Sequence, residues 1–264
     1  MAVVVLASGT GAPGVTTTCL GLALSWPRPV LLVDADPSGG SAILAGYLKG
    51  QVPHDRGLVD LALAYRHGDL DNAIREATIA LPGSQVELLP GVRSHSQAAT
   101  VQPLWEPLAQ VLAGMGELGV DVLVDAGRVG MAGTPWPLIT SADLVALATR
   151  TTLPAVAGAR SAAGSLAQRL RDAGTEDALG VVVIGPGRPY STREVGRVLG
   201  MDVLAELAWD PASADVYHLG AMPRRRFAAA ALPRSLVAAG EALRAWVEGG
   251  QRRLGIRESL ASGT

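Results

Sequence analysis

A glycine-rich turn near the N-terminus has the residue types of a site that holds an anion. Gly9, Gly11 and Gly14 lie between an apolar run at residues 3–8 and a helical pattern that opens with threonines at 16–18. Glycines let the backbone approach a ligand closely, and the N–H groups and dipole at the start of a helix favour negative charge. The spacing therefore predicts a cradle for phosphate after the first strand.

Carboxylates follow two later apolar runs. Asp34 and Asp36 come at the end of the run at 30–34, and Asp125 ends the run at 120–125. Carboxylates suit Mg²⁺, which keeps several of its waters. Ligands of parallel α/β sheets bind outside the carboxyl ends of the strands, so the cradle and these carboxylates are expected at one edge. The alternative, that Asp34 and Asp36 only cap the following turn and helix, stays open.

The glycine-rich turn departs from the usual phosphate-loop pattern at one position. The pattern G-x-x-x-x-G-K-[ST] is satisfied at Gly9, Gly14 and Thr16, but Val15 stands where the lysine belongs. Of the 22 basic residues, 21 are arginine, and Lys49 is the only lysine of the chain. Lys49 lies far from the turn in sequence, so a site that requires a lysine at the turn has none.

Short, nearly continuous apolar runs alternate with helical patterns along the whole chain, which is typical of strands buried on both faces of a parallel sheet. We predict a single three-layer α/β/α domain over residues 1–250, with a mostly parallel sheet of seven or eight strands, and a basic, flexible tail over 251–264. The expected strands are 3–8, 30–34, 86–89, 120–125, 144–149, 180–185 and 203–208. The expected helices are 16–24, 41–48, 58–65, 70–77, 104–115, 155–172, 191–199 and 232–253.

Composition excludes several classes of protein. Hydrophobic residues make up 48% of the 264 residues, which excludes disorder, and the single cysteine excludes a disulfide scaffold. The apolar N-terminus lacks a positive region, so we expect a cytoplasmic protein rather than a secreted one. Formal net charge is −2, but residues 220–264 carry eight Arg against three Glu. This basic region could contact DNA, an anionic membrane or an acidic partner, or be a solvated helix face.

Residues 8–18 resemble the deviant Walker A motif, S-G-K-G-G-x-G-K-T-T, of ParA/MinD-type P-loop ATPases. In that family one lysine reaches the partner's nucleotide across a dimer, and the other holds the β- and γ-phosphates. The corresponding residues here are Thr10 and Val15. The resemblance implies a nucleotide site formed by Gly9, Thr10, Gly11, Ala12, Pro13, Gly14, Val15, Thr16, Thr17, Asp210 and Pro211.

Other segments carry the same resemblance. Residues 34–40 are similar to the family's D-x-D-P-x-G-[GN] segment and residues 121–125 to its Walker B strand. These imply Mg²⁺ at Thr16, Asp34 and Asp125, partly through water, and a catalytic role for Asp36 in orienting the attacking water. Residues 207–210 and 220–223 resemble the base-pocket stretch, I-P-x-D…G-x-x-P. The adenine-reading Asn is missing, and residues 184–186 hold Ile-Gly-Pro in its place.

Loss of the lysines has a calculable cost. A charge-assisted contact to phosphate contributes about 1.5–3 kcal/mol to binding, and one missing donor in a preorganised site lowers the rate roughly 10²–10³-fold. Arg128, Arg150 and Arg188, at or just past strand ends, are candidates to reach a phosphate instead. A hydrolysis-deficient positioning or scaffolding factor of cell pole, division, chromosome or pilus machinery is therefore favoured, as in the branch that localises tight-adherence (Flp) pili.

The alternative is a working Mg-ATP-dependent ATPase that cycles between a monomer and a sandwich dimer. The retained Thr16, Asp34, Asp36 and Asp125 favour it, whereas Thr10 and Val15 oppose it. ATP and Mg²⁺ are the cofactors under either hypothesis, if nucleotide binds. The family resemblance further implies a protein partner, a homodimer and recruitment to a pole or membrane. The Arg-rich C-terminal region is the candidate for weak contact with DNA or membrane.

Overall fold

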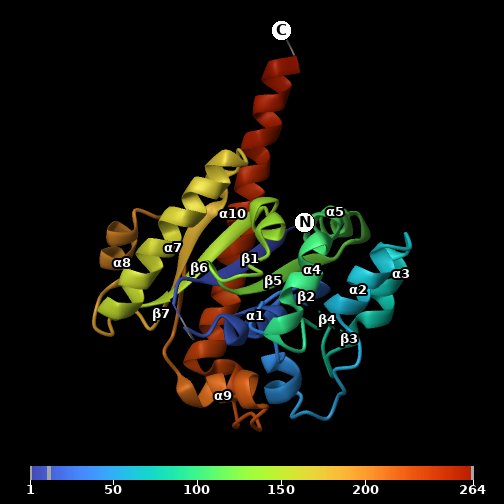
Figure 1. The fold of residues 1–264 in the computed structure, drawn as a ribbon. Coiled ribbons are helices and arrows are strands. Elements are labelled where there is room, and N and C mark those ends of the chain that lie inside the picture. The colour runs from blue at the N-terminus through green and yellow to red at the C-terminus, as the bar shows by residue number, and fades with distance from the viewer. Residues whose placement is uncertain (1, 11–12, 263–264) are drawn as a thin grey trace.

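The computed structural model describes residues 2–10 and 13–262 of the chain, with side chains up to residue 251. Figure 1 shows a central sheet with helices on both sides. The strands are β1 (Val3–Ser8), β2 (Val30–Asp34), β3 (Ile79–Ala80), β4 (Val86–Leu89), β5 (Asp121–Arg128), β6 (Leu144–Arg150), β7 (Leu179–Ile184) and β8 (Val203–Leu207). The α-helices are α1 (Val15–Ser25), α2 (Leu58–Tyr65), α3 (Leu70–Ala77), α4 (Ala98–Val101), α5 (Trp105–Gly114), α6 (Trp136–Thr140), α7 (Leu153–Asp172), α8 (Thr192–Leu199), α9 (Pro211–Leu219) and α10 (Ala231–Ser262).

The strands form one sheet in the order β3-β4-β2-β5-β1-β6-β7-β8. Only the two-residue β3 runs antiparallel, against β4, and the other pairings are parallel. The chain leaves β1 toward β2 on one side and later reaches β6 on the other side. This reversal opens a crevice at the carboxyl ends of the strands beside β1. The predicted, mostly parallel α/β sheet is confirmed.

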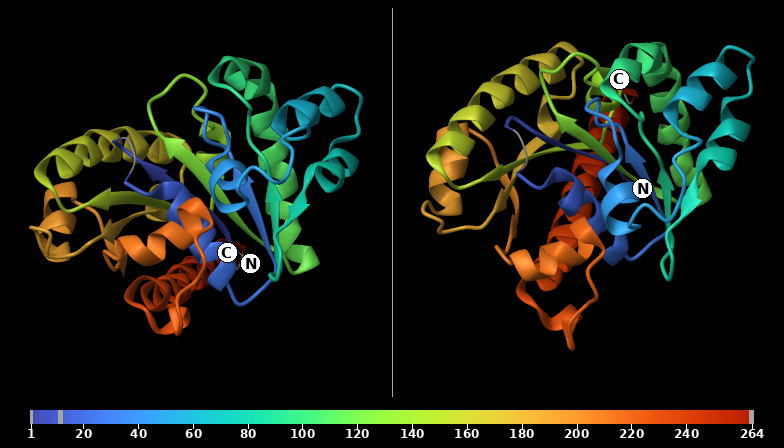
Figure 2. Two further views of the ribbon diagram at one scale, coloured as in Figure 1. Left: turned by 90° about the horizontal axis from the view of Figure 1, so that it is seen from below. Right: turned by 60° about the horizontal axis from the view of Figure 1, so that its bottom comes forward.

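Two apolar layers separate the sheet from its helices. One layer includes residues of α2 to α8, and the other includes residues of α1, α9 and α10. Figure 2 shows the two groups of helices on opposite faces of the sheet. Strands β1, β2 and β6 are buried on both faces, and nearly all of their side chains are apolar. The core thus fixes the strand ends at which the polar residues meet.

Several predicted elements differ in detail. The expected helix at 41–48 is a single π-helical turn, Ile43–Tyr47. Strand β5 continues through Gly127, at φ 61°, to Arg128, and its pairing with β1 is irregular between Leu6 and Ser8. The short strand β3 and the helices α4, α6 and α9 were not predicted.

Helix α10 runs across the expected boundary at residue 250 and ends at Ser262. Its side chains from 252 onward lie outside the described residues, as do residues 263–264 entirely, so the flexible basic tail over 251–264 stays a prediction. Across residues 2–10 and 13–262, no helix combines the length and apolar character needed to span a bilayer.

Candidate functional site

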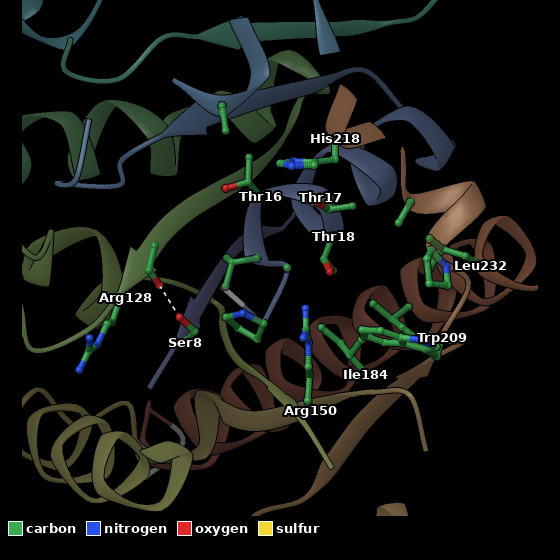
Figure 3. Close-up of a pocket in the computed structure, with 18 of the residues that line it drawn as sticks. Ser8, Thr16, Thr17, Thr18, Arg128, Arg150, Ile184, Trp209, His218 and Leu232 are labelled. Atoms are coloured by element: carbon green, nitrogen blue, oxygen red, sulfur yellow. Dashed lines mark hydrogen bonds between the residues drawn. The ribbon is translucent and has the colours of Figure 1, made fainter. Parts of the chain in front are cut away.

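A cavity of about 620 Å³ opens at the carboxyl ends of β1, β5, β6, β7 and β8. Figure 3 shows Arg150 and Trp209 on one side of the cavity and Thr16 to Thr18 on the other, while the Ser8 hydroxyl donates to the Gly127 carbonyl at 3.4 Å. Of the residues predicted to bind a cofactor, those that line it are Pro13, Gly14, Val15, Thr16, Thr17, Asp210 and Pro211. Asp36 also lines it. Gly11 and Ala12 lie outside the described residues.

The glycine-rich turn leads directly into α1. Gly14 has φ 108°, a conformation that glycine adopts without a steric penalty, and α1 begins at the next residue. No side chain of the described residues caps this end of α1, and its first turn contains no acidic residue. The Thr18 N–H donates to the Gly14 carbonyl at 2.9 Å, which is the first hydrogen bond of the helix. The N–H groups before Thr18 therefore have no partner within the helix. This geometry provides a cradle for an anion.

The side chain at the lysine position belongs to the core. Val15 is only 6% exposed and joins the apolar layer that contains Leu6 and Cys19. It also contributes to the wall of the cavity. Val15 therefore provides packing and an apolar surface where a phosphate loop of the usual pattern provides a cation.

Gly9 and Thr10, in the first part of the loop, pack closely against α7 of the same chain. A Cβ on Gly9 would lie 2.5 Å from the Gly158 carbonyl and 2.7 Å from the Ala162 methyl. A Cβ on Gly158 would collide with the Thr10 methyl group. Glycine at 9 and 158 thus permits the close approach. Neither Gly9 nor Thr10 lines the cavity.

Asp34 and Asp125 lie side by side beneath the loop, because β2 and β5 pair directly with these two residues in register. Both are buried, at 5% and 1% exposure. Burial raises the pKa of Asp34 to about 6, opposed by the Ser41 hydroxyl, and the charge of Asp36 adds to the increase. Burial also raises the pKa of Asp125 to about 7, and the nearby Asp34 charge contributes to it. Two neighbouring buried carboxylates therefore favour a bound proton or a cation.

Asp125 has one oxygen occupied and one available. The Gly127 N–H donates to its Oδ1 at 2.9 Å, whereas its Oδ2 is buried with no hydrogen-bond partner among the described residues. The Thr16 hydroxyl is near enough to lower the pKa of Asp125, but it does not reach hydrogen-bonding geometry with Oδ2. A buried acceptor without a partner costs free energy unless something fills the position.

These residues fit Mg²⁺ together with a phosphate. In the described part of the chain, no three His, Cys, Asp or Glu side chains converge into a metal site of their own. Mg²⁺ commonly needs only one or two carboxylates when phosphate oxygens and water complete its shell. Thr16, Asp34 and Asp125 would hold it, and the ion would supply positive charge between carboxylate and phosphate oxygens.

Asp36 lies beside the metal-side pair with its carboxylate close over Gly127, where a Cβ would collide with it. Its Oδ1 accepts from the Ser38 N–H at 2.8 Å and from the Ser38 hydroxyl at 2.7 Å. The turn-capping alternative is therefore present in the structure. Asp36 also lines the cavity, so the capping contact and exposure to the cavity occur together.

The candidate cations occupy different positions. Arg150 lines the cavity half-buried, with its Cζ 4.7 Å from the Trp209 ring centroid. Arg128 lines the rim and is exposed, and Arg188 is exposed and does not line the cavity. The Lys49 side chain passes beside Gly220, at the end of α9, and is also outside the lining.

Another part of the cavity wall is formed by α9, a helix that was not predicted from the sequence. Asp210 caps α9 by accepting from the Ser213 N–H at 3.1 Å and the Ser213 hydroxyl at 2.6 Å, which lowers the pKa of Asp210. Pro211 is the first residue of α9. Trp209, within the stretch 207–210 that resembles the base pocket, also lines the cavity, as does His218, which was not predicted as a site residue. The sequence Asp-Pro-x-Ser, followed by Gly220, was the signal for this helix.

The solved structures that resemble this chain include ParA-family and MinD proteins. No protein-family model matches the chain, and no curated protein matches its sequence. A ParA family ATPase from Chlorobium tepidum superposes with a TM-score of 0.71 at 14% identity, over 90% of this chain and 98% of that one. MinD from Pyrococcus horikoshii, in complex with Mg-ADP, gives 0.67 at 19% identity over 91% and 94%. MinD of a MinC:MinD complex from Aquifex aeolicus gives 0.70 at 16% identity over 93% and 96%.

These matches span nearly the whole chain, as the resemblance of its motifs predicted, although the sequences have diverged widely. The eight-stranded sheet, the turn before α1 and the cavity at the strand ends are arranged in one α/β unit. The chain therefore has the fold of the ParA/MinD-type P-loop ATPases.

Proposed function

We propose that this chain is a ParA/MinD-like positioning or scaffolding protein that does not hydrolyse ATP. The observation that carries the proposal is the position of Val15, whose side chain is packed into the apolar layer at the lysine position. Thr10, at the other lysine position, packs against α7 of its own chain. Both residues are therefore committed to internal packing.

The consequence for catalysis is larger than that for binding. Catalysis of phosphoryl transfer is mainly electrostatic stabilisation of the transferring group, and each missing donor costs roughly 10²–10³ in rate. The N–H groups at the start of α1 still favour an anion, and Mg²⁺, if Asp34 and Asp125 held it, would add positive charge. The combination supports a nucleotide-binding fold that keeps affinity and loses turnover.

A working ATPase is the second candidate, and one observation favours it. The cavity is lined by Thr16 and Asp36, and the paired Asp34 and Asp125 lie beside it. The Oδ2 atom of Asp125 has no hydrogen-bond partner among the described residues. In this alternative Asp36 orients the attacking water, and the protein cycles between a monomer and a nucleotide-sandwich dimer. Arg150 would then have to supply the charge that Thr10 and Val15 lack.

A scaffold acts through what it assembles. We therefore propose a protein partner, by analogy with the MinC:MinD complex, with a homodimer as a further form. Such a partner would recruit the chain to a pole or membrane, and division, chromosome or pilus machinery would be the cargo. The exposed Arg224 to Arg226, with the basic region beyond them, is the surface for weak contact with DNA or membrane. DNA contact of this kind weakens steeply with salt.

Thermal unfolding with and without Mg-ATP separates the two candidates when phosphate release is measured in the same samples. Nucleotide at 100 times its dissociation constant stabilises the folded state by about 2.7 kcal/mol. A stabilised protein that releases no phosphate supports the proposal. Phosphate release that depends on the protein rejects it in favour of the ATPase, and no stabilisation at millimolar Mg-ATP rejects nucleotide binding under either candidate.

A further inference from the structure

We propose that Arg150 is the phosphate-binding cation of the cavity, and that its ligand is a nucleoside polyphosphate. The charge would reach the phosphates from the end of β6 instead of from the loop before α1. This inference rests on the proposed function, because it takes the cavity as a nucleotide site, and it adds the residue that makes binding feasible without the lysines.

Arg150 is placed at the cavity by the sheet. It is the last residue of β6, which pairs in parallel with β1 so that Ala148 lies opposite Ser8 at the start of the loop. On its other side Arg150 pairs with Ile184, at the end of β7. In Figure 3 the Arg150 side chain points into the cavity, whereas Arg128 points away from its centre. The guanidinium is thus carried by a rigid, buried strand.

Trp209 holds the guanidinium in position. The Arg150 Cζ lies 4.7 Å from the ring centroid of Trp209, within the range of a cation–π interaction. Trp209 itself is 38% exposed and lies between β8 and α9, where it also lines the cavity. A planar guanidinium matches phosphate oxygens with several donors, and a stacked one loses less conformational freedom when it binds.

The other cations are less suited to this role. Arg128 is exposed, so solvent and salt screen its charge more than that of the half-buried Arg150. Arg188 and Lys49 do not line the cavity. Arg150 therefore combines three properties that the others do not share: it lines the cavity, is partly shielded from solvent and is oriented by an aromatic ring.

The lining fixes the ligand class. The cavity volume of about 620 Å³ is in the range of small-molecule sites. Its hydroxyls at Thr16 and Thr17 stand at the N-terminus of α1, which suits phosphate. Ile184, Leu207 and Leu232 add an apolar surface to the lining that suits a planar base. Hydroxyls and an arginine for phosphates, together with an apolar surface for a base, describe a nucleoside polyphosphate.

Calorimetric titration of the full chain with ADP, ATP and inorganic pyrophosphate, each with Mg²⁺, tests the assignment. Arg150→Gln should weaken ADP and ATP about 10- to 100-fold, as expected for loss of a charge-assisted hydrogen bond in a partly buried site. Arg188→Gln is the matched control, an exposed arginine outside the lining, and should change either affinity less than about threefold. Trp209→Leu, which keeps the charge and removes the ring beneath it, should weaken both nucleotides by a smaller factor.

Nucleotide affinity tests the role of Arg150, whereas phosphate release tests the proposed function, so the two can fail separately. Equal nucleotide affinity in the wild type and in Arg150→Gln would overturn the inference, as would loss of binding in Arg128→Gln alone. No binding of ADP, ATP or pyrophosphate by the wild type would also overturn it. Phosphate release from ATP would reject the hydrolysis-deficient function while leaving an Arg150-dependent affinity intact. If Arg150→Gln does not fold, unchanged affinity in Trp209→Leu counts against the inference.

Discussion

Val15 stands where a phosphate loop of this fold usually has its lysine, and its side chain completes the apolar layer around Leu6 and Cys19. Because it also forms part of the cavity wall, a longer side chain at this position has a route out of the core. Gly14, at φ 108°, leads into the start of α1, where the first N–H groups of the helix can meet an anion. The missing element is the charge rather than the loop.

Val15→Lys should therefore strengthen Mg-ATP binding. One additional charge-assisted hydrogen bond is equivalent to about 10- to 150-fold in affinity, while the loss of apolar packing lowers the free energy of unfolding by about 1–3 kcal/mol. Calorimetry and denaturant unfolding measure the two effects. Val15→Met is the control of similar length without charge, and an equal increase in affinity from Val15→Met would show that charge is not the cause.

The buried pair Asp34 and Asp125 predicts a stability that depends on pH. Their folded-state pKa values of about 6 and about 7 are higher than the ordinary value of 3.8. At pH values between the unfolded-state pKa and these folded-state pKa values, the folded state binds more protons than the unfolded state. The free energy of unfolding therefore falls as the pH rises through this range. From pH 5 to pH 8 the metal-free protein should lose on the order of 2–4 kcal/mol in free energy of unfolding.

Asp125→Asn removes one of the two charges and should flatten this profile, making the variant more stable than the wild type at pH 8. Urea denaturation at several pH values, with chelator present, measures the effect. If the variant lost stability with pH as steeply as the wild type, the buried pair would not be the cause.

At the scale of elements, the contact between the loop and α7 depends on glycine at position 158. Alanine within a helix is normally more stable than glycine by about 1 kcal/mol. Here a methyl group would collide with Thr10, so Gly158→Ala should lower the free energy of unfolding by about 1–3 kcal/mol. Adding Thr10→Ser to Gly158→Ala removes the opposing methyl group and should restore part of the lost free energy of unfolding.

Gly164→Ala provides the matched control in the same helix, because no atom lies within 4 Å of an added Cβ there. This variant should be as stable as the wild type or more so. Thermal unfolding of the three variants checks the comparison. Equal stability of Gly158→Ala and Gly164→Ala would disprove the close packing of Thr10 on α7.

The elements also show what a single sequence can and cannot predict. The strands Val3–Ser8 and Val30–Asp34 match their expected limits, because apolar runs buried on both faces have clear ends, and Val86–Leu89 matches as well. Residues 41–48 have the apolar pattern of a helix, but they form only a π-helical turn, Ile43–Tyr47, packed against α9. The two-residue β3 is too short to produce a periodic pattern.

Contacts between residues far apart in the sequence could not be predicted from local patterns. The loop, Asp36 and the pair Asp34 and Asp125 were expected at one edge because parallel strands align their carboxyl ends. The stacking of Arg150 on Trp209 joins β6 to the segment before α9, and no local pattern encodes it. The packing of Thr10 on α7 likewise depends on where the sheet places α7.

On the scale of the whole molecule, the sheet order β3-β4-β2-β5-β1-β6-β7-β8 brings residues from five strand ends around one cavity. The ParA/MinD fold is thus complete, including a cavity of about 620 Å³ and a carboxylate pair suited to Mg²⁺ with phosphate. The single lysine of the chain, Lys49, is outside that cavity. The proposed function therefore combines the framework of a nucleotide-binding fold with the absence of the two lysines.

Phosphate release from saturating Mg-ATP is the decisive measurement, with Asp36→Asn as the reference, because the family resemblance implies that Asp36 would orient an attacking water. We expect the wild type and Asp36→Asn to release phosphate at the same background rate, in conditions where calorimetry shows nucleotide bound. Release by the wild type well above that of Asp36→Asn would contradict it and identify the chain as a working ATPase.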